Sequence, residues 1–178
     1  TPSARELSDG GYAHPEIQRI TAEALKDMMD RAEAAGAYSK DMGTVVWYGF
    51  VLIDVQPESD VDAEGHKRFS RSFLLGSTNV PFSYYRVTDP ERELSPEELS
   101  AYRAEQDSIS QAIAKLRRDR PVILCDATGD DAAACALALK LIEAGFDPGQ
   151  VSVMWQGFNH WAYDLGYPFA QIDWRPAP

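Results

Sequence analysis

The chain has 178 residues, 44% of them hydrophobic, which is enough to bury the core of one ordinary domain without disulfides or a structural metal. With 17 basic and 28 acidic residues its net charge is −11, and such a field repels nucleic acid and anionic lipid surfaces. No apolar run approaches the roughly 20 residues that span a bilayer. We therefore expect no nucleic acid partner and no membrane insertion.

The pattern of polar and apolar residues divides the chain into three regions. We expect an N-terminal arm over residues 1–18, one α/β domain over 19–170 and a Pro-rich C-terminal tail over 171–178. The domain opens with a helix that Thr21 caps and Gly36 ends.

The strongest strand signal extends from Val45 to Val55. Its second half, FVLIDV, has no polar alternation before its aspartate, as is typical of a strand buried on both faces of a parallel sheet. Gly49 indicates a bend or a second short strand. Residues 56–69 are charged and loop-like, and a short segment follows at 77–81, where Pro81 marks its end or a sheet edge.

The next helix has a clear beginning. Ser95 is the expected N-cap, Pro96 occupies the first helical position, and Glu98 completes a capping box. We expect this helix to reach about Arg118. The run VILC at 122–125 then predicts another buried strand.

The last third repeats the alternation. An Ala- and Leu-rich helix ends at Gly145, VSVMW at 151–155 predicts a strand, and a short helix follows from Gly157. Apolar strands that alternate with helices through short connections predict a three-layer α/β fold with a mostly parallel sheet. Three tryptophans are expected to anchor its core: Trp47, Trp155 and Trp161.

Cys125 has the most suggestive position in the chain. It closes a predicted parallel strand just before a helix, where open α/β sheets bind ligands. Backbone amides and the helix dipole at such a point stabilise a thiolate, which is the nucleophilic form of cysteine. The second cysteine, Cys135, lies among alanines in the predicted helix, and we expect it to be a core residue and both cysteines to remain thiols.

Four segments, in this order, resemble the rhodanese-like domain family from about Ile20 to Pro168. Each is a weak signal alone, but their order and spacing together are specific. They are LIDV at 52–55, GH at 65–66 with GSTNVP at 76–81, VILC at 122–125 with the helix that leads to GF at 145–146, and QGFNHW at 156–161.

The resemblance implies a five-stranded, mostly parallel sheet with helices on both faces. It also implies that Cys125 takes sulfane sulfur from a small donor such as thiosulfate, holds it as a persulfide and passes it to a thiophilic acceptor such as a protein thiol. No cofactor or metal is implied. Asp54 and His66 would fix the strand and the neighbouring loop. The cradle for the persulfide would be the amides of Asp126, Ala127, Thr128, Gly129, Asp130 and Asp131.

Three departures from the family pattern bear on activity. Gln56 stands where the family usually has Arg, and the loop carries three aspartates, with no Arg or Lys between Cys125 and Lys140. The loop is also longer than in the short-loop members of the family, with Gly129 four residues past Cys125 rather than three. In its length it is similar to the loop of phosphatases and arsenate reductases of this superfamily, which ends with an Arg that binds the oxyanion. Asp131 occupies that place here, so those two activities are disfavoured.

Two hypotheses for the function remain. The first is a rhodanese-like sulfurtransferase or sulfur carrier that uses Cys125. The second is a catalytically silent rhodanese-like module that binds a protein partner or a small ligand through the same loop; the acidic loop and Gln56 favour it. The start at Thr1 suggests trimming, which leaves the compartment open between export and the cytoplasm.

Overall fold

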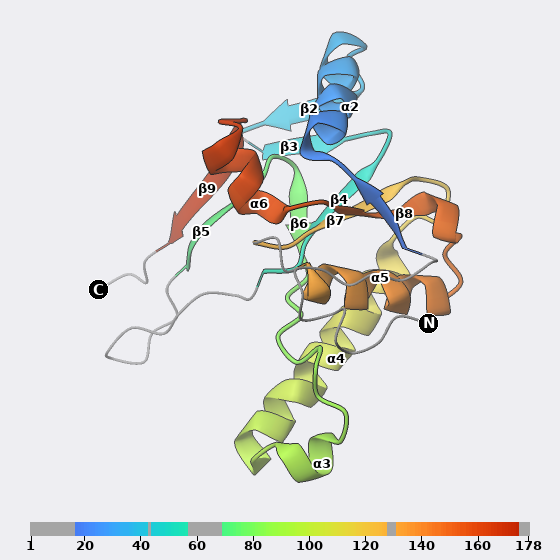
Figure 1. Cartoon of the computed structure of the whole chain (residues 1–178), viewed down its shortest axis with the longest axis vertical. Coiled ribbons are helices and arrows are strands. Elements are labelled where there is room, and N and C mark those ends of the chain that lie inside the picture. The colour runs from blue at the N-terminus through green and yellow to red at the C-terminus, as the bar shows by residue number, and fades with distance from the viewer. Residues whose placement is uncertain (1–16, 43, 57–68, 128–130, 175–178) are drawn as a thin grey trace.

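Five strands form the central sheet of the computed structural model, which describes residues 17–42, 44–56, 69–127 and 131–174 (Figure 1). Every pair of neighbouring strands in this sheet is parallel. The predicted mostly parallel, five-stranded α/β fold is thereby confirmed. In spatial order the strands are β1 (Gln18–Ile20), β8 (Val151–Met154), β7 (Val122–Cys125), β4 (Val51–Asp54) and β6 (Ser77–Asn79).

One face of the sheet is covered by α2 (Ala22–Ala34) and by the segment that combines α6 (Gly157–Asn159) with η2 (His160–Asp164). The Thr21 hydroxyl accepts the amide of Ala24, as expected for an N-cap. Inward-facing residues from both elements pack with alternate residues of β4 and β7. This cluster includes Leu25, Met29, Leu52, Ile123, Phe158 and Trp161.

The other face is covered by α4 (Pro96–Lys115) and α5 (Ala132–Glu143). The predicted capping box of α4 is present, with Ser95 and Glu98 each bonding to the other's backbone amide. α5 is the more buried helix of the two because seven of its residues, including Cys135 and Leu137, are buried. The short helices α3 (Pro90–Glu93) and η1 (Pro148–Gln150) lie in the connections.

Two antiparallel pairs stand beside the central sheet. The hairpin of β2 (Tyr38–Asp41) and β3 (Thr44–Trp47) precedes β4, and β5 (Phe69–Leu74) pairs with β9 (Phe169–Trp174). β3 is the second short strand that Gly49 indicated. In the part of the chain that the structure describes, no helix is both long and apolar enough to cross a membrane.

Four strands of the structure are not predicted from the sequence: β1, β2, β5 and β9. β1 has only three residues, two of them polar, and it becomes recognisable only through its pairing with β8. The expectation that Trp155 anchors the core is wrong, since its side chain is 42% exposed, whereas Trp47 and Trp161 are buried as predicted. α4 ends at Lys115, three residues before the expected boundary.

Candidate functional site around Cys125

Cys125 is the last residue of β7, at the edge of the sheet where all five parallel strands end. Its register partner on β4 is Asp54, the last residue of that strand, and the Val55 amide donates to the Cys125 carbonyl. The sheet therefore places a thiol and a carboxylate at the same level on neighbouring strands. Both side chains are buried, each with 2% of its surface exposed.

The Cys125 thiol is held in its protonated form. It donates a hydrogen bond to the carbonyl oxygen of Asp126 at 3.2 Å. Burial raises the pKa of the thiol well above its ordinary value of 9.0, and the carboxylates of Asp54 and Asp126 raise this pKa further. Because the thiolate is the reactive form, the resting site has little nucleophile at neutral pH.

Asp54 joins the end of β4 to the end of the neighbouring strand β6. Its carboxylate accepts the Gln56 amide at 3.0 Å and the Asn79 side-chain nitrogen at 3.4 Å. That nitrogen also donates to the carbonyls of Asp54 and Gln56, so Asn79 ties β6 to the turn after β4. The side-chain nitrogen of Gln56 donates in turn to the Ser72 carbonyl on β5.

In the loop after Cys125, a backbone amide donates to a side chain of the loop itself. The amide of Ala127 donates to a carboxylate oxygen of Asp126 at 2.7 Å. This amide, which the sequence analysis assigned to an anion cradle, therefore has an internal carboxylate as its acceptor. Thr128, Gly129 and Asp130 lie outside the described residues, so their part of the cradle remains a prediction.

The segment after β8 covers the beginning of this loop. The amides of Phe158 and Asn159 donate to the carbonyls of Asp126 at 2.7 Å and Ala127 at 2.8 Å. The chain turns into this position through two residues with positive φ, Gln156 at 66° and Gly157 at 73°. The buried Phe158 ring belongs to the same apolar cluster as Cys125, which helps to explain why the thiol is buried.

Asp131 holds the N-cap position of α5, without a capping hydrogen bond from its side chain, and is almost completely buried, with 1% of its surface exposed. Its carboxylate lies 3.6 Å from a guanidinium nitrogen of Arg19, which reaches it from β1. The Arg19 guanidinium also lies over the ring of Trp155, 4.8 Å from the ring centroid. The loop therefore ends in a buried anion, and the cation that pairs with it comes from the edge strand β1.

The structure brings Cys125, Asp54, Gln56, Asp126 and Asp131 to one edge of the sheet. His66 lies outside the described residues. Three residues that sequence reasoning did not single out also belong to this edge: Arg19, Asn79 and Phe158. For Asn79 a signal existed, because it lies in the GSTNVP motif; nothing in the sequence pointed to Arg19.

The comparison with protein families decides which fold family this arrangement represents. The sequence profile described as rhodanese-like domain matches residues 21–164, most of the chain. The chain belongs to the rhodanese-like domain family. No curated protein sequence matches the chain significantly.

Several solved structures resemble this chain at low sequence identity. A protein from Bacillus halodurans superimposes with a TM-score of 0.50 at 12% identity, over 86% of this chain and 76% of that chain. A rhodanese-related protein from Thermoplasma volcanium gives 0.43 at 15% identity, covering 86% and 97%. An As-Sb reductase from Leishmania major gives 0.43 at 13% identity, covering 87% and 92%. At 12% identity the Bacillus halodurans structure shows a similar fold and nothing beyond it.

Proposed function

We propose that this rhodanese-like domain is a binding module whose Cys125 remains a protonated thiol, and that it is not an efficient thiosulfate sulfurtransferase. The observation that carries the proposal is the burial of Cys125 beside the carboxylates of Asp54 and Asp126, which raises the pKa of the thiol. Sulfur transfer begins with attack by a thiolate, so a site that disfavours the thiolate is slow.

The negative charge around the loop also argues against thiosulfate as the sulfur donor. Thiosulfate carries two negative charges and would approach the carboxylates of Asp54, Asp126 and Asp131. The guanidinium that contacts this loop, that of Arg19, is already paired with Asp131. An acidic edge of this kind suits a neutral or cationic group of a protein or small ligand, since either avoids the repulsion.

A second function is favoured by the position of Cys125 itself. The thiol stands at the strand end where the family resemblance puts the sulfur-carrying cysteine. A slow sulfur carrier remains compatible with the site if its donor is uncharged or borne by a protein, because such a donor does not feel the three carboxylates as thiosulfate does.

Intact-mass measurement separates the two functions. The protein is incubated with thiosulfate, 3-mercaptopyruvate or a polysulfide, and a gain of one sulfur atom is sought in the wild type, in Cys125→Ser and in Cys135→Ser. Cys135 is a matched control because it is also a buried free thiol. The binding module predicts no gain with any donor under native conditions.

The other outcomes are equally definite. A gain with polysulfide alone, retained in Cys135→Ser and lost in Cys125→Ser, would establish the sulfur carrier. A rapid gain with thiosulfate that depends on Cys125 would overturn the proposal and restore the sulfurtransferase hypothesis. Denatured wild type, in which both thiols are accessible, serves as the positive control for the donors.

A further inference from the structure

A groove runs between α4 and α5 on the face of the sheet opposite α2. It has a volume of about 310 Å³, at the lower end of the range of small-molecule sites. We call it the α4–α5 groove; its main lining residues are Gln106, Ile109, Ser110, Ile113, Lys140 and Glu143. Lys140 follows Asp131 by nine residues of α5, or about 14 Å along the helix axis, so the groove is separate from the Cys125 loop.

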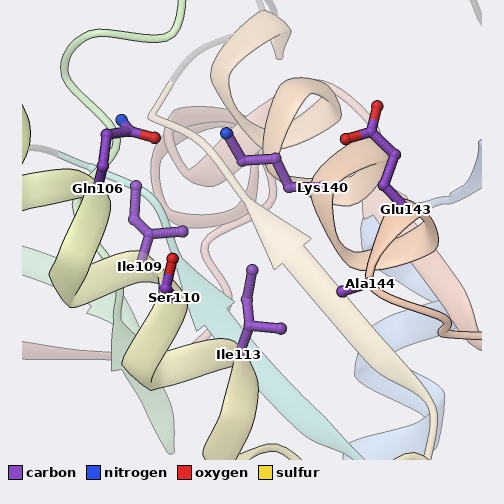
Figure 2. A pocket seen from close by; sticks show the side chains of 7 residues that line it. All are labelled: Gln106, Ile109, Ser110, Ile113, Lys140, Glu143 and Ala144. Carbon is purple, nitrogen blue, oxygen red and sulfur yellow. The ribbon is translucent and has the colours of Figure 1, made fainter.

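The floor of the groove is aliphatic. Figure 2 shows the side chains of Ile109 and Ile113 directed from α4 into the space beside α5. Ile109 is only 2% exposed and belongs to the apolar cluster under the two helices, against which Ile113 also packs. Such a floor binds a hydrocarbon chain by the hydrophobic effect.

The rim of the groove offers a cation and polar side chains to an anion. In Figure 2 Lys140 reaches from α5 toward Gln106 on α4, while the carboxylate of Glu143 extends in another direction, on the far side of Lys140 from Gln106. The Lys140 ammonium lies 5.7 Å from the centroid of the Phe82 ring, which helps to fix its place. Ser110 adds a hydroxyl beside the floor.

Lys140 has no described carboxylate within ion-pair distance. Nor do the side chains of Gln106 and Ser110 hydrogen-bond to any residue that the structure describes. The ammonium, the amide and the hydroxyl can therefore all serve a ligand. Six other cations, by contrast, are paired with carboxylates: Arg19, Lys26, Arg31, Arg92, Arg103 and Arg117.

We propose that the α4–α5 groove is a binding site for a small aliphatic monocarboxylate. The carboxylate contacts the Lys140 ammonium and the Gln106 amide, and the hydrocarbon chain lies on Ile109 and Ile113. One cation matches one negative charge, which favours a carboxylate over a doubly charged phosphate ester. The proposal does not rest on the chemistry of Cys125.

Titration with hexanoate, followed by backbone amide NMR shifts, tests the site. A groove of this size with one charged contact predicts saturable shifts at the lining residues, with a dissociation constant on the order of 1 mM. Two probes of the same chain length, 1-hexanol and hexylamine, serve as ligand controls. Loss of the charge-assisted contact predicts binding of hexanol roughly tenfold weaker, and hexylamine should not bind in the groove.

Three variants assign the binding to named side chains. Lys140→Met keeps the apolar part of the side chain and should weaken hexanoate binding roughly tenfold. Gln106→Glu places a carboxylate opposite Lys140 and should weaken it as well. Lys115→Met removes an exposed lysine of α4 outside the groove and should leave the affinity unchanged.

The proposal is overturned by any of three results. These are the absence of saturable hexanoate shifts at the groove, equal affinity for hexylamine, and unchanged affinity in Lys140→Met. None of the three substituted residues is itself buried, so each variant is expected to fold, and the NMR spectrum without ligand checks this directly.

Discussion

The two ends of helix α5 differ in how the charged side chains beside them are buried and paired. A helix N-terminus favours a negative charge and its C-terminus a positive one. At the N-terminus the negative charge is the carboxylate of Asp131, buried and held by Arg19. At the C-terminus the cations are Arg118, which donates to the Ala144 carbonyl at 2.7 Å, and the partly exposed Lys140.

This difference separates a closed site from an open one. At the N-terminus the Ala127 amide and the Arg19 guanidinium already bind carboxylates of the chain itself. These two groups are therefore not available to an outside anion. At the C-terminus Lys140 still faces a groove, with no described carboxylate paired to it. Each end of α5 carries the sign of charge that the helix dipole favours. The two ends therefore differ in how far those charges are buried and paired.

The largest expected effect is at the N-terminus of α5, which we call its closed end; the C-terminus beside the α4–α5 groove is its open end. Asp131→Asn removes the negative charge that pairs with Arg19 and that interacts favourably with the dipole of α5. This substitution should lower the free energy of unfolding by about 2 kcal/mol. The loss is smaller than for a fully buried pair because 24% of the Arg19 side chain is exposed. Urea unfolding followed by circular dichroism measures it.

Asp30→Asn is the matched control for Asp131→Asn. Asp30 pairs with Lys26 on the surface of α2, and its loss should cost about 0.5 kcal/mol or less. A double-mutant cycle with Arg19→Gln should give a coupling energy of about 1 kcal/mol between Arg19 and Asp131. If Asp131→Asn is as mild as Asp30→Asn, Arg19 and Asp131 do not hold this end of the helix.

Structural features could be predicted from the sequence where their contacts are local. The strand ends at Asp54 and Cys125 could be predicted because buried parallel strands are short apolar runs with little alternation. The capping box at Ser95 could be predicted because its partners are three residues apart. Local patterns of this kind carry most of the fold.

Contacts between distant segments could not be predicted in the same way. Arg19 reaches Asp131 only because three residues of β1 pair with β8, and those residues have no strand pattern of their own. The burial of Cys125 depends on β4 beside it and on the segment of Phe158 above its loop. The sequence therefore located the thiol but left its accessibility open.

A smaller effect is expected at the open end of α5. Gly145 ends the helix with a φ of 101°, and a Cβ atom there would lie 2.5 Å from a guanidinium nitrogen of Arg118. Gly145→Ala should therefore cost about 1 to 2 kcal/mol of unfolding free energy, from backbone strain and a displaced Arg118. Differential scanning calorimetry would show the lower melting temperature.

Two further variants divide this cost between its causes. Gly49→Ala is the control, because Gly49 has no positive φ and a Cβ atom added there would meet nothing within 4 Å, so stability should hardly change. In an Arg118→Ala background, Gly145→Ala should cost less, since only the backbone strain remains. An equal cost in both backgrounds would show that Arg118 has no part in it.

The smallest effect at neutral pH, and one that grows with alkalinity, concerns Cys125. The folded state raises the pKa of this thiol, first by burial and then through Asp54 and Asp126, so it favours the protonated form. Below the unfolded pKa, near 9.0, both states are protonated and the stabilisation is fully present. As the pH rises above that value the unfolded thiol ionises first, and stability is lost until the folded pKa is reached.

Wild type should therefore lose unfolding free energy relative to Cys125→Ala in alkaline solution, but not between about pH 6 and 8, a window that lies below both pKa values. Urea unfolding of the two proteins at a series of pH values measures the difference. Parallel curves up to strongly alkaline pH would mean that Cys125 ionises as readily in the fold as outside it. The closed end of α5 would then be open to sulfur chemistry, because a thiol that ionises freely in the folded state is available as a nucleophile.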